Sequence, residues 1–166
     1  GFDIGISGTV DAENVTMSTI DIQSIVNHGT LTIDTALITN TATGILSTNT
    51  LTVDDVSFFE TGVAIDVVSG TADITGLGLE NVSVGLGSDS GASTTVSSIY
   101  GQHVALLIDG TDADDLTVSN ALVSGDRLLW GSIESIALSD MNFTQENPGR
   151  SAIDLRCSVD CTFDHL

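Results

Sequence analysis

The sequence has no lysine and few cations of any kind. Its 166 residues contain three Lys+Arg, all of them arginine, against 23 Asp+Glu, which gives a formal net charge of −20. Nucleic acids and anionic membranes are bound through cations that contact phosphates, so the composition excludes these partners. A very acidic, lysine-free surface instead suits solubility, cation binding or a saline setting, in which salt screens the repulsion between carboxylates.

Aromatic residues and long apolar runs are also scarce. Aromatics make up 4% of the chain while hydrophobic residues make up 41%, and this apolar content argues against disorder. No window is long and apolar enough for a transmembrane helix, and no signal peptide is visible. The first residue is Gly1 rather than methionine, and the repeat described below is already running there. We therefore expect one domain spanning 1–166, as a segment of a longer protein without membrane insertion.

Only two cysteines are present, in the sequence Arg-Cys-Ser-Val-Asp-Cys-Thr. Cys157 and Cys161 are separated by three residues, which differs from the Cys-x-x-Cys of redox and zinc sites. Their spacing allows a local disulfide across a bend, which would fit an oxidising compartment. Two small buried apolar side chains are the equally open alternative.

What the sequence does contain is an internal repeat. The template Φ-x-Φ-x-x-Φ-x-Φ, where Φ is apolar, begins at residues 10, 31, 51, 72, 94, 116 and 136, at steps of 20 to 22 residues. Of its 28 Φ positions, 26 are apolar, and the exceptions are Thr94 and Gly101. The apolar residues that occupy x positions are Leu37, Tyr100, Leu122 and Ala137. A repeat of this length is the mark of a stacked architecture.

The repeat predicts an all-β fold. Alternation with a period of two indicates strands with one buried face, and the two-residue break turns the chain while keeping that face inside. A third apolar strand precedes each template, so every unit offers three short strands and three corners. One unit is too small to bury its apolar face, whereas stacked units bury it against neighbouring coils. We therefore predict a parallel β-helix of about eight coils of ~21 residues. A sandwich would need the hairpin turns that are nearly absent here.

This arrangement resembles the right-handed parallel β-helix of the pectate-lyase-like superfamily, including the repeat regions of surface and adhesin-type proteins. Proteins of that kind have three strands per coil and a short corner between the second and third strands, often holding a ladder of asparagines. The resemblance covers nearly the whole chain and implies the fold. It rests on coil length and corner spacing, and fold alone does not establish function.

The two-residue break is expected to be a structural corner. Its second position reads Asn14, Thr35, Asp55, Gly76, Ser98, Asn120 and Asp140. Glycine, asparagine and aspartate tolerate a left-handed backbone, and five of these seven residues belong to that set. The adjacent pair Asp54-Asp55 is thereby interpreted as a corner rather than a catalytic pair.

The resemblance also implies where an enzyme of this fold would hold its site. Related hydrolases use aspartate pairs with Gly-His-Gly and Arg-x-Lys motifs, whereas this chain has Gly101-Gln102-His103 and no lysine. Related lyases use Ca²⁺ held by acidic residues beside an arginine base. Arg127 and Arg156, with Asp154 nearby, are the weak candidates for such a catalytic set. The alternative is arginines that pair with surface acids, which contributes little energy.

A calcium site is considered in the insertion between residues 109 and 115. Asp109, Asp112, Asp114 and Asp115 place four carboxylates within seven residues, and Ca²⁺ prefers oxygen ligands. The spacing is not that of an EF-hand, so a solvated acidic loop is the alternative reading. His28, His103 and His165 lie in different coils, and we expect no shared metal site for them.

Threonines flank the first apolar position of most repeats. The predicted outer columns include Thr30, Thr32, Thr50, Thr52, Thr95 and Thr117. Coils stacked roughly 4.8 Å apart would align these side chains in two ranks. Such ranks resemble the flat faces of ice-binding β-solenoids, although threonine also suits any exposed strand face.

We interpret the chain as a non-catalytic module of an extracellular or cell-surface protein. It would act as a stalk, an adhesin or a surface-layer component, stacked on neighbouring coils of its own longer chain and in contact with glycans or other surface proteins, with Ca²⁺ as a possible ligand. A polysaccharide lyase or hydrolase on the same fold, and an ice-binding solenoid, are the alternatives.

Overall fold

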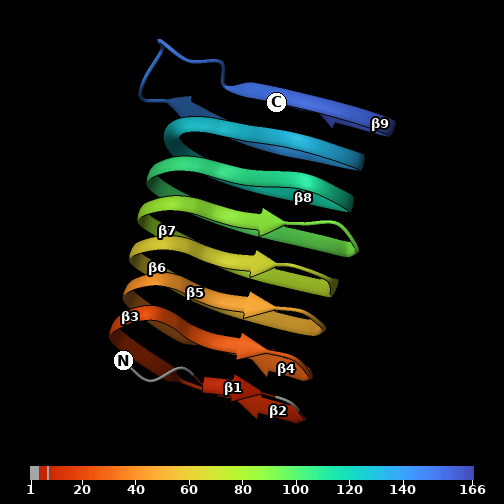
Figure 1. Cartoon of the computed structure of the whole chain (residues 1–166). Coiled ribbons are helices and arrows are strands. Elements are labelled where there is room, and N and C mark those ends of the chain that lie inside the picture. The colour runs from red at the N-terminus through yellow and green to blue at the C-terminus, as the bar shows by residue number, and fades with distance from the viewer. Residues whose placement is uncertain (1–3, 7) are drawn as a thin grey trace.

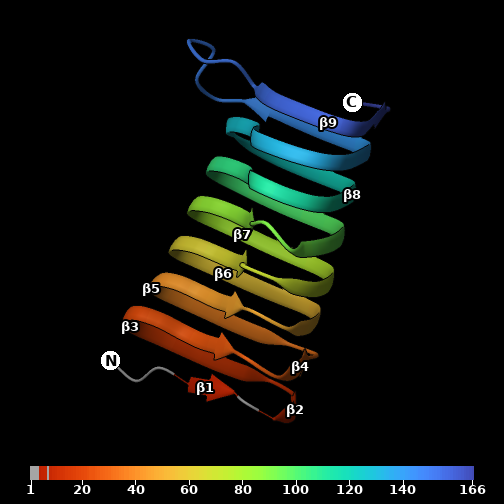
Figure 2. The same cartoon turned by 45° about the vertical axis from the view of Figure 1, so that its right-hand side comes forward.

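The chain winds into a stack of parallel β-coils, seen from two sides in Figures 1 and 2. The computed structural model describes the backbone of residues 4–6 and 8–166 and the side chains of 8–18 and 23–166. Successive coils lie about 21 residues apart and make a β-solenoid of about seven turns. At a spacing of roughly 4.8 Å per coil, seven turns give a rod on the order of 34 Å long. Among the described residues, no helix is long and apolar enough to cross a membrane.

The strands are long because β-structure continues through the corners of the coils. Their bounds are β1 (Ile4–Ile6), β2 (Thr9–Ala12), β3 (Val15–Asn27), β4 (Thr30–Ile33), β5 (Ala36–Ser47), β6 (Thr50–Val67), β7 (Gly70–Ser88), β8 (Ala92–Gln145) and β9 (Ile153–Asp164). All pairings between these strands are parallel, and the main path of the sheet runs β1-β3-β5-β6-β7-β8-β9. The predicted parallel β-helix is thereby confirmed.

The strand register matches the alignment of the repeats. Leu31 of β4 pairs with Leu51 of β6, Leu51 pairs with Ala72 of β7, and Ala72 pairs with Thr94 of β8. These residues occupy the first Φ position of four successive templates. Each template position therefore becomes a column that runs along the axis of the solenoid.

The inward columns form one hydrophobic core along the stack. Phe58 is 1% exposed, and its ring lies where a side chain on Gly44 would otherwise point. Thr94, one of the two template exceptions, is also buried, and its hydroxyl lies 3.3 Å from that of Ser88. The first template is less covered, with Val10 37% exposed, and among the described residues its strand β2 pairs with β4.

The corner column is left-handed at most of its positions. The φ angles are 53° at Asn14, 56° at Asp55, 70° at Gly76, 60° at Ser98, 54° at Asn120 and 51° at Asp140. Thr35 occupies the same column without a positive φ. Residues that tolerate a left-handed backbone therefore stand where the chain needs one.

A second left-handed column lies five residues after the first. It contains Asn40, Glu60, Asn81 and His103, with φ between 50° and 55°. The repeat template does not predict this corner. Asn40 and Asn81 at a constant offset from the first corner were the available signal, and Glu60 and His103 at the same offset obscured it.

The stack has about seven turns rather than about eight. The segment from Ile153 onwards pairs with β8 as the single strand β9 and ends before a further turn is complete. Between β8 and β9, the loop of residues 146–152 projects at the end of the stack (Figure 2).

Candidate functional site

The outer face that follows the left-handed corner carries a shallow groove. Its hollow, of about 400 Å³, has Leu37 at one end and Tyr100 at the other, with Phe59 and Glu80 beside them. One column on this face reads Leu37, Ser57, Gly78 and Tyr100 through four successive coils. Small side chains in the two middle coils leave the space between the two large ones.

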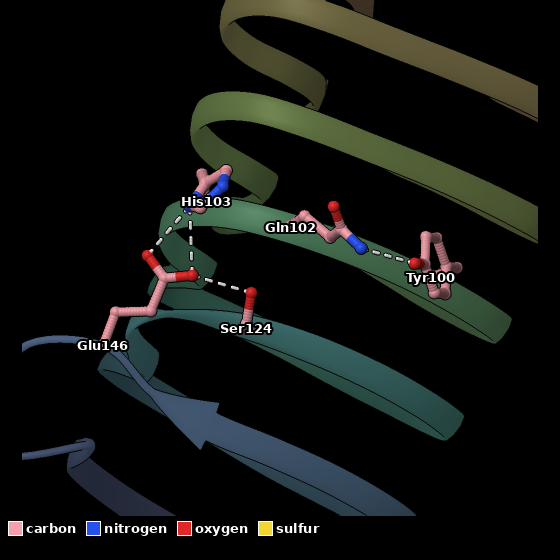
Figure 3. Close-up of polar contacts among 5 residues, drawn as sticks. All are labelled: Tyr100, Gln102, His103, Ser124 and Glu146. Atoms are coloured by element: carbon pink, nitrogen blue, oxygen red, sulfur yellow. Dashed lines mark hydrogen bonds and ion pairs between the residues drawn. The ribbon is translucent and has the colours of Figure 1, made fainter.

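The parallel column supplies the other side of the groove. Thr39, Phe59, Glu80 and Gln102 are in register on successive coils. Gln102 donates from Nε2 to the hydroxyl oxygen of Tyr100 at 2.6 Å (Figure 3), which holds the two exposed side chains together. The tyrosine O–H remains free to donate towards a ligand.

This groove was missed as a site, although its signal was present in the repeat. Leu37, Tyr100 and Leu122 are apolar residues in an x position of the template, and all three occupy the same x position. Their exposed fractions are 45%, 54% and 53%. Three large apolar side chains standing outward in one column of an otherwise polar face mark a contact surface.

A second hollow continues the groove towards the N-terminal coils. It has a volume of about 330 Å³ and shares Leu37 and Ser57 with the first. Asn14 and Asp55 of the left-handed corner also line it. The groove therefore runs along the solenoid axis and carries a carboxylate in each half, Asp55 in one and Glu80 in the other.

A polar cluster lies beyond the groove at the next corner (Figure 3). Glu146, from the loop after β8, accepts a hydrogen bond from Ser124 Oγ at 2.7 Å and lies 3.1 Å from Nδ1 of His103. These two contacts lower the pKa of the Glu146 carboxyl, the hydrogen bond from Ser124 contributing most. The backbone N–H of Glu146 also donates to the carbonyl oxygen of Gly125 at 2.7 Å, so the cluster fastens the loop to the stack.

The predicted threonine columns are aligned on an outer face. Thr30 pairs with Thr50, and Thr32 pairs with Thr52, which pairs in turn with Asp73. Asp73 then pairs with Thr95 in the next coil. Thr117 lines a hollow of about 150 Å³ together with Asp115 and Asp160. The ranks are therefore real columns interrupted by aspartates.

The four aspartates proposed for calcium are spread along the coil. Asp109 lies in one column with Asp66 and Gly87 of the two preceding coils. Asp112 has a left-handed backbone conformation, with a φ of 57°. Ala113 is buried between Asp112 and Asp114, whereas Asp115 belongs to the threonine face. In the part of the chain that the structure describes, no three His, Cys, Asp or Glu side chains gather into a group able to hold a metal ion. The calcium site stays a prediction.

Carboxylates nevertheless crowd together at one corner. Burial raises the pKa of Asp66, and the neighbouring charges of Asp89 and Asp109 raise it further. The pKa of Asp89 is raised by burial and then by Asp109 and Asp112. Asp66 directs Oδ1 over Gly87, where an added Cβ would lie 2.6 Å from that oxygen.

The weak catalytic candidates are divided between two coils. Asp154 and Arg156 lie on β9, where they pair with Trp130 and Ser132. The pairing of β8 with β9 begins at Leu129 and Ile153. Arg127 comes two residues before Leu129, so it lies beside the residues that precede β9. Among the described side chains, those of residues 8–18 and 23–166, no arginine forms an ion pair with a carboxylate. The arrangement shows no shared arginine–carboxylate centre among these three residues.

The two cysteines are joined in a disulfide on β9. The Cα atoms of Cys157 and Cys161 lie 6.3 Å apart. This distance falls within the range that a disulfide requires.

Comparison with protein-family models, with curated proteins and with solved structures finds no match to this chain.

Proposed function

We propose that the chain is a non-catalytic β-solenoid module of an extracellular or cell-surface protein, serving as a stalk, an adhesin or a surface-layer component. The observation that carries this proposal is the unbroken stack of parallel coils around one core. Each strand pairs with its equivalent in the next coil, so the module resists bending and presents long outer faces. Membership of the pectate-lyase-like superfamily is part of the same proposal, supported by coil length and the corner between strands.

The surface supports a contact role more than a catalytic one. Arg127 lies on the coil before Asp154 and Arg156, and among the described residues no three His, Cys, Asp or Glu side chains gather into a group able to hold a metal ion. The disulfide between Cys157 and Cys161 supports an oxidising, extracellular setting. The net charge of −20 keeps such a surface soluble in saline surroundings.

Turnover of acidic polysaccharides tests the non-catalytic proposal. The protein is incubated with polygalacturonate and with alginate, in the presence of Ca²⁺, and the absorbance of unsaturated products and the release of reducing ends are followed. We expect neither signal to exceed that of heat-treated protein. Product formation that Arg156→Ala abolishes would establish the lyase alternative.

Ice binding is a second candidate, favoured by the register of the threonine columns. Thr30 with Thr50, and Thr32 with Thr52, form a two-by-two array on neighbouring coils. Thermal hysteresis of the protein in dilute buffer, compared with Thr52→Lys, is the measurement that decides this candidate. Thermal hysteresis that Thr52→Lys abolishes would favour ice binding over the alternative, in which threonine is present only because it suits an exposed strand.

A further inference from the structure

The groove between Leu37 and Tyr100 combines aromatic rings with a carboxylate. Phe59 and Glu80 are in register on adjacent coils, roughly 4.8 Å apart. Gly78 and Tyr100 are paired in the same way in the neighbouring column. A group resting between the rings of Phe59 and Tyr100 would therefore meet the Glu80 carboxylate, since all three line one hollow.

Rings beside a carboxylate form a receptor for a cation. A guanidinium or ammonium group is attracted to the face of an aromatic ring, and an arginine also stacks flat on it. Glu80 adds a charge-assisted hydrogen bond, which an arginine forms with two parallel donors. Because Gly78 has no side chain, the planar guanidinium group of an arginine has room there.

The negative charge around the groove also favours a cationic ligand. Residues 1–126 contain no lysine or arginine, and every residue of both hollows belongs to this range. A basic partner would be steered towards this surface, whereas an anionic polysaccharide would be repelled. A second copy of the chain is disfavoured because it also carries a charge of −20.

The length of the groove adds a spacing rule. Three coil steps separate Leu37 from Tyr100, which is roughly 14 Å. An extended peptide rises about 3.3 Å per residue, so residues i and i+4 lie about 13 Å apart on one face. An apolar residue over Leu37 and a basic residue whose backbone lies level with Tyr100 would then be four residues apart, with the long basic side chain reaching back one coil over Gly78.

We propose that this groove binds an extended segment of a partner protein, with an arginine or lysine beside Tyr100, Phe59 and Glu80 and an apolar residue four positions away against Leu37. The inference deepens the contact role proposed above and names its partner as a basic peptide segment. It does not require catalysis or a bound metal.

The experiment uses the single tyrosine and the single tryptophan as reporters. The protein, labelled with ¹³C in both ring systems, is titrated with the acetylated and amidated peptide Leu-Thr-Ser-Thr-Arg. We expect the ring signals of Tyr100 to shift and saturate, while those of Trp130, which lies outside the groove, stay unchanged. A peptide with the same composition but leucine and arginine three residues apart is expected to bind at least threefold more weakly.

Two charge variants distinguish a specific contact in the groove from the attraction of a basic peptide to the overall negative charge of the protein. Glu80→Gln and Glu134→Gln remove the same charge from exposed positions, but only Glu80 lines the groove. We expect Glu80→Gln to weaken peptide binding at least threefold and Glu134→Gln to leave it within experimental error. Trp130 signals and far-ultraviolet circular dichroism check that both variants are folded.

Four results would overturn the inference, and the first three concern the variants and the probes. They are equal weakening by both charge variants, indifference to the leucine–arginine spacing, and saturating Tyr100 shifts with a neutral xylo-oligosaccharide but none with the peptide. The absence of any shift with either probe would also reject it. None of these outcomes bears on turnover or on cell-surface exposure, so the broader proposal would stand or fall separately.

Discussion

Two glycines in β7 offer a sharp test of the corner geometry. Gly76 has a φ of 70°, and a Cβ added there would lie 3.1 Å from the backbone N and Cα of Asp55 in the preceding coil. Gly78 has no such backbone angle, and its added Cβ would meet mainly the side-chain oxygen of Ser57 at 2.8 Å. The same substitution to alanine should therefore have opposite effects two residues apart.

The expected magnitudes follow from the backbone. A left-handed alanine costs about 1–2 kcal/mol, and the more restricted unfolded chain offsets about 0.4–1 kcal/mol of that. Gly76→Ala should therefore lower the free energy of unfolding by about 1 kcal/mol. Gly78→Ala should raise it by up to about 0.5 kcal/mol, because the Ser57 hydroxyl can rotate away.

Thermal unfolding followed by far-ultraviolet circular dichroism measures the difference. For a chain of this size a gap of about 1.5 kcal/mol separates the two Tm values by roughly 3–6 °C. Gly76→Asn should recover most of the loss, since Asn14 and Asn120 occupy the same column with φ of 53° and 54°. Equal stability of the two alanine variants would refute the corner reasoning.

Three further predictions concern the charged corner, the core and calcium. Asp66→Asn should stabilise the protein at pH 7 by a few tenths to about 1 kcal/mol, because burial disfavours the charged form of Asp66 and the charges of Asp89 and Asp109 add repulsion. Since the pKa of Asp66 is raised above 3.8, the repulsion is present above the folded-state pKa and fades as the pH falls through it. Urea unfolding should therefore show a gain at pH 7 that shrinks as the pH is lowered through the pKa of Asp66, and a gain of the same size at every pH would contradict this cause. Phe58→Ala should cost about 3–5 kcal/mol in the same assay, since Phe58 is 1% exposed, and a loss below about 1 kcal/mol would contradict the packing. A chelator should leave Tm unchanged, because the aspartates between Asp109 and Asp115 do not converge, whereas a drop of several degrees would support calcium.

The fold was predictable because one physical rule repeats along the chain. Each coil must bury the same columns, so the alternation of apolar residues records the register directly. Leu31, Leu51 and Ala72 pair as the repeat aligned them. The predicted count of about eight coils exceeds the observed count of about seven, because the residues from Ile153 pair with β8 as one strand.

The candidate site was harder to predict because it departs from the repeat. Outward side chains face water rather than a fixed neighbour, so the alternation of apolar and polar residues does not determine which residue types occupy the outward positions. The outward apolar residues Leu37 and Tyr100 were visible in the repeat, but the groove between them depends on the register that places Ser57 and Gly78 in the same column. The contact between Glu146 and His103 spans 43 residues, a separation that no local pattern reports.

Exposure on the outside of intact cells tests the proposed surface role most directly. Antibodies raised against this chain are applied to intact and to permeabilised cells that produce it, and bound antibody is counted by flow cytometry. The proposed role predicts equal labelling of intact and permeabilised cells. Labelling that appears only after permeabilisation would place the module inside the cell and contradict that role.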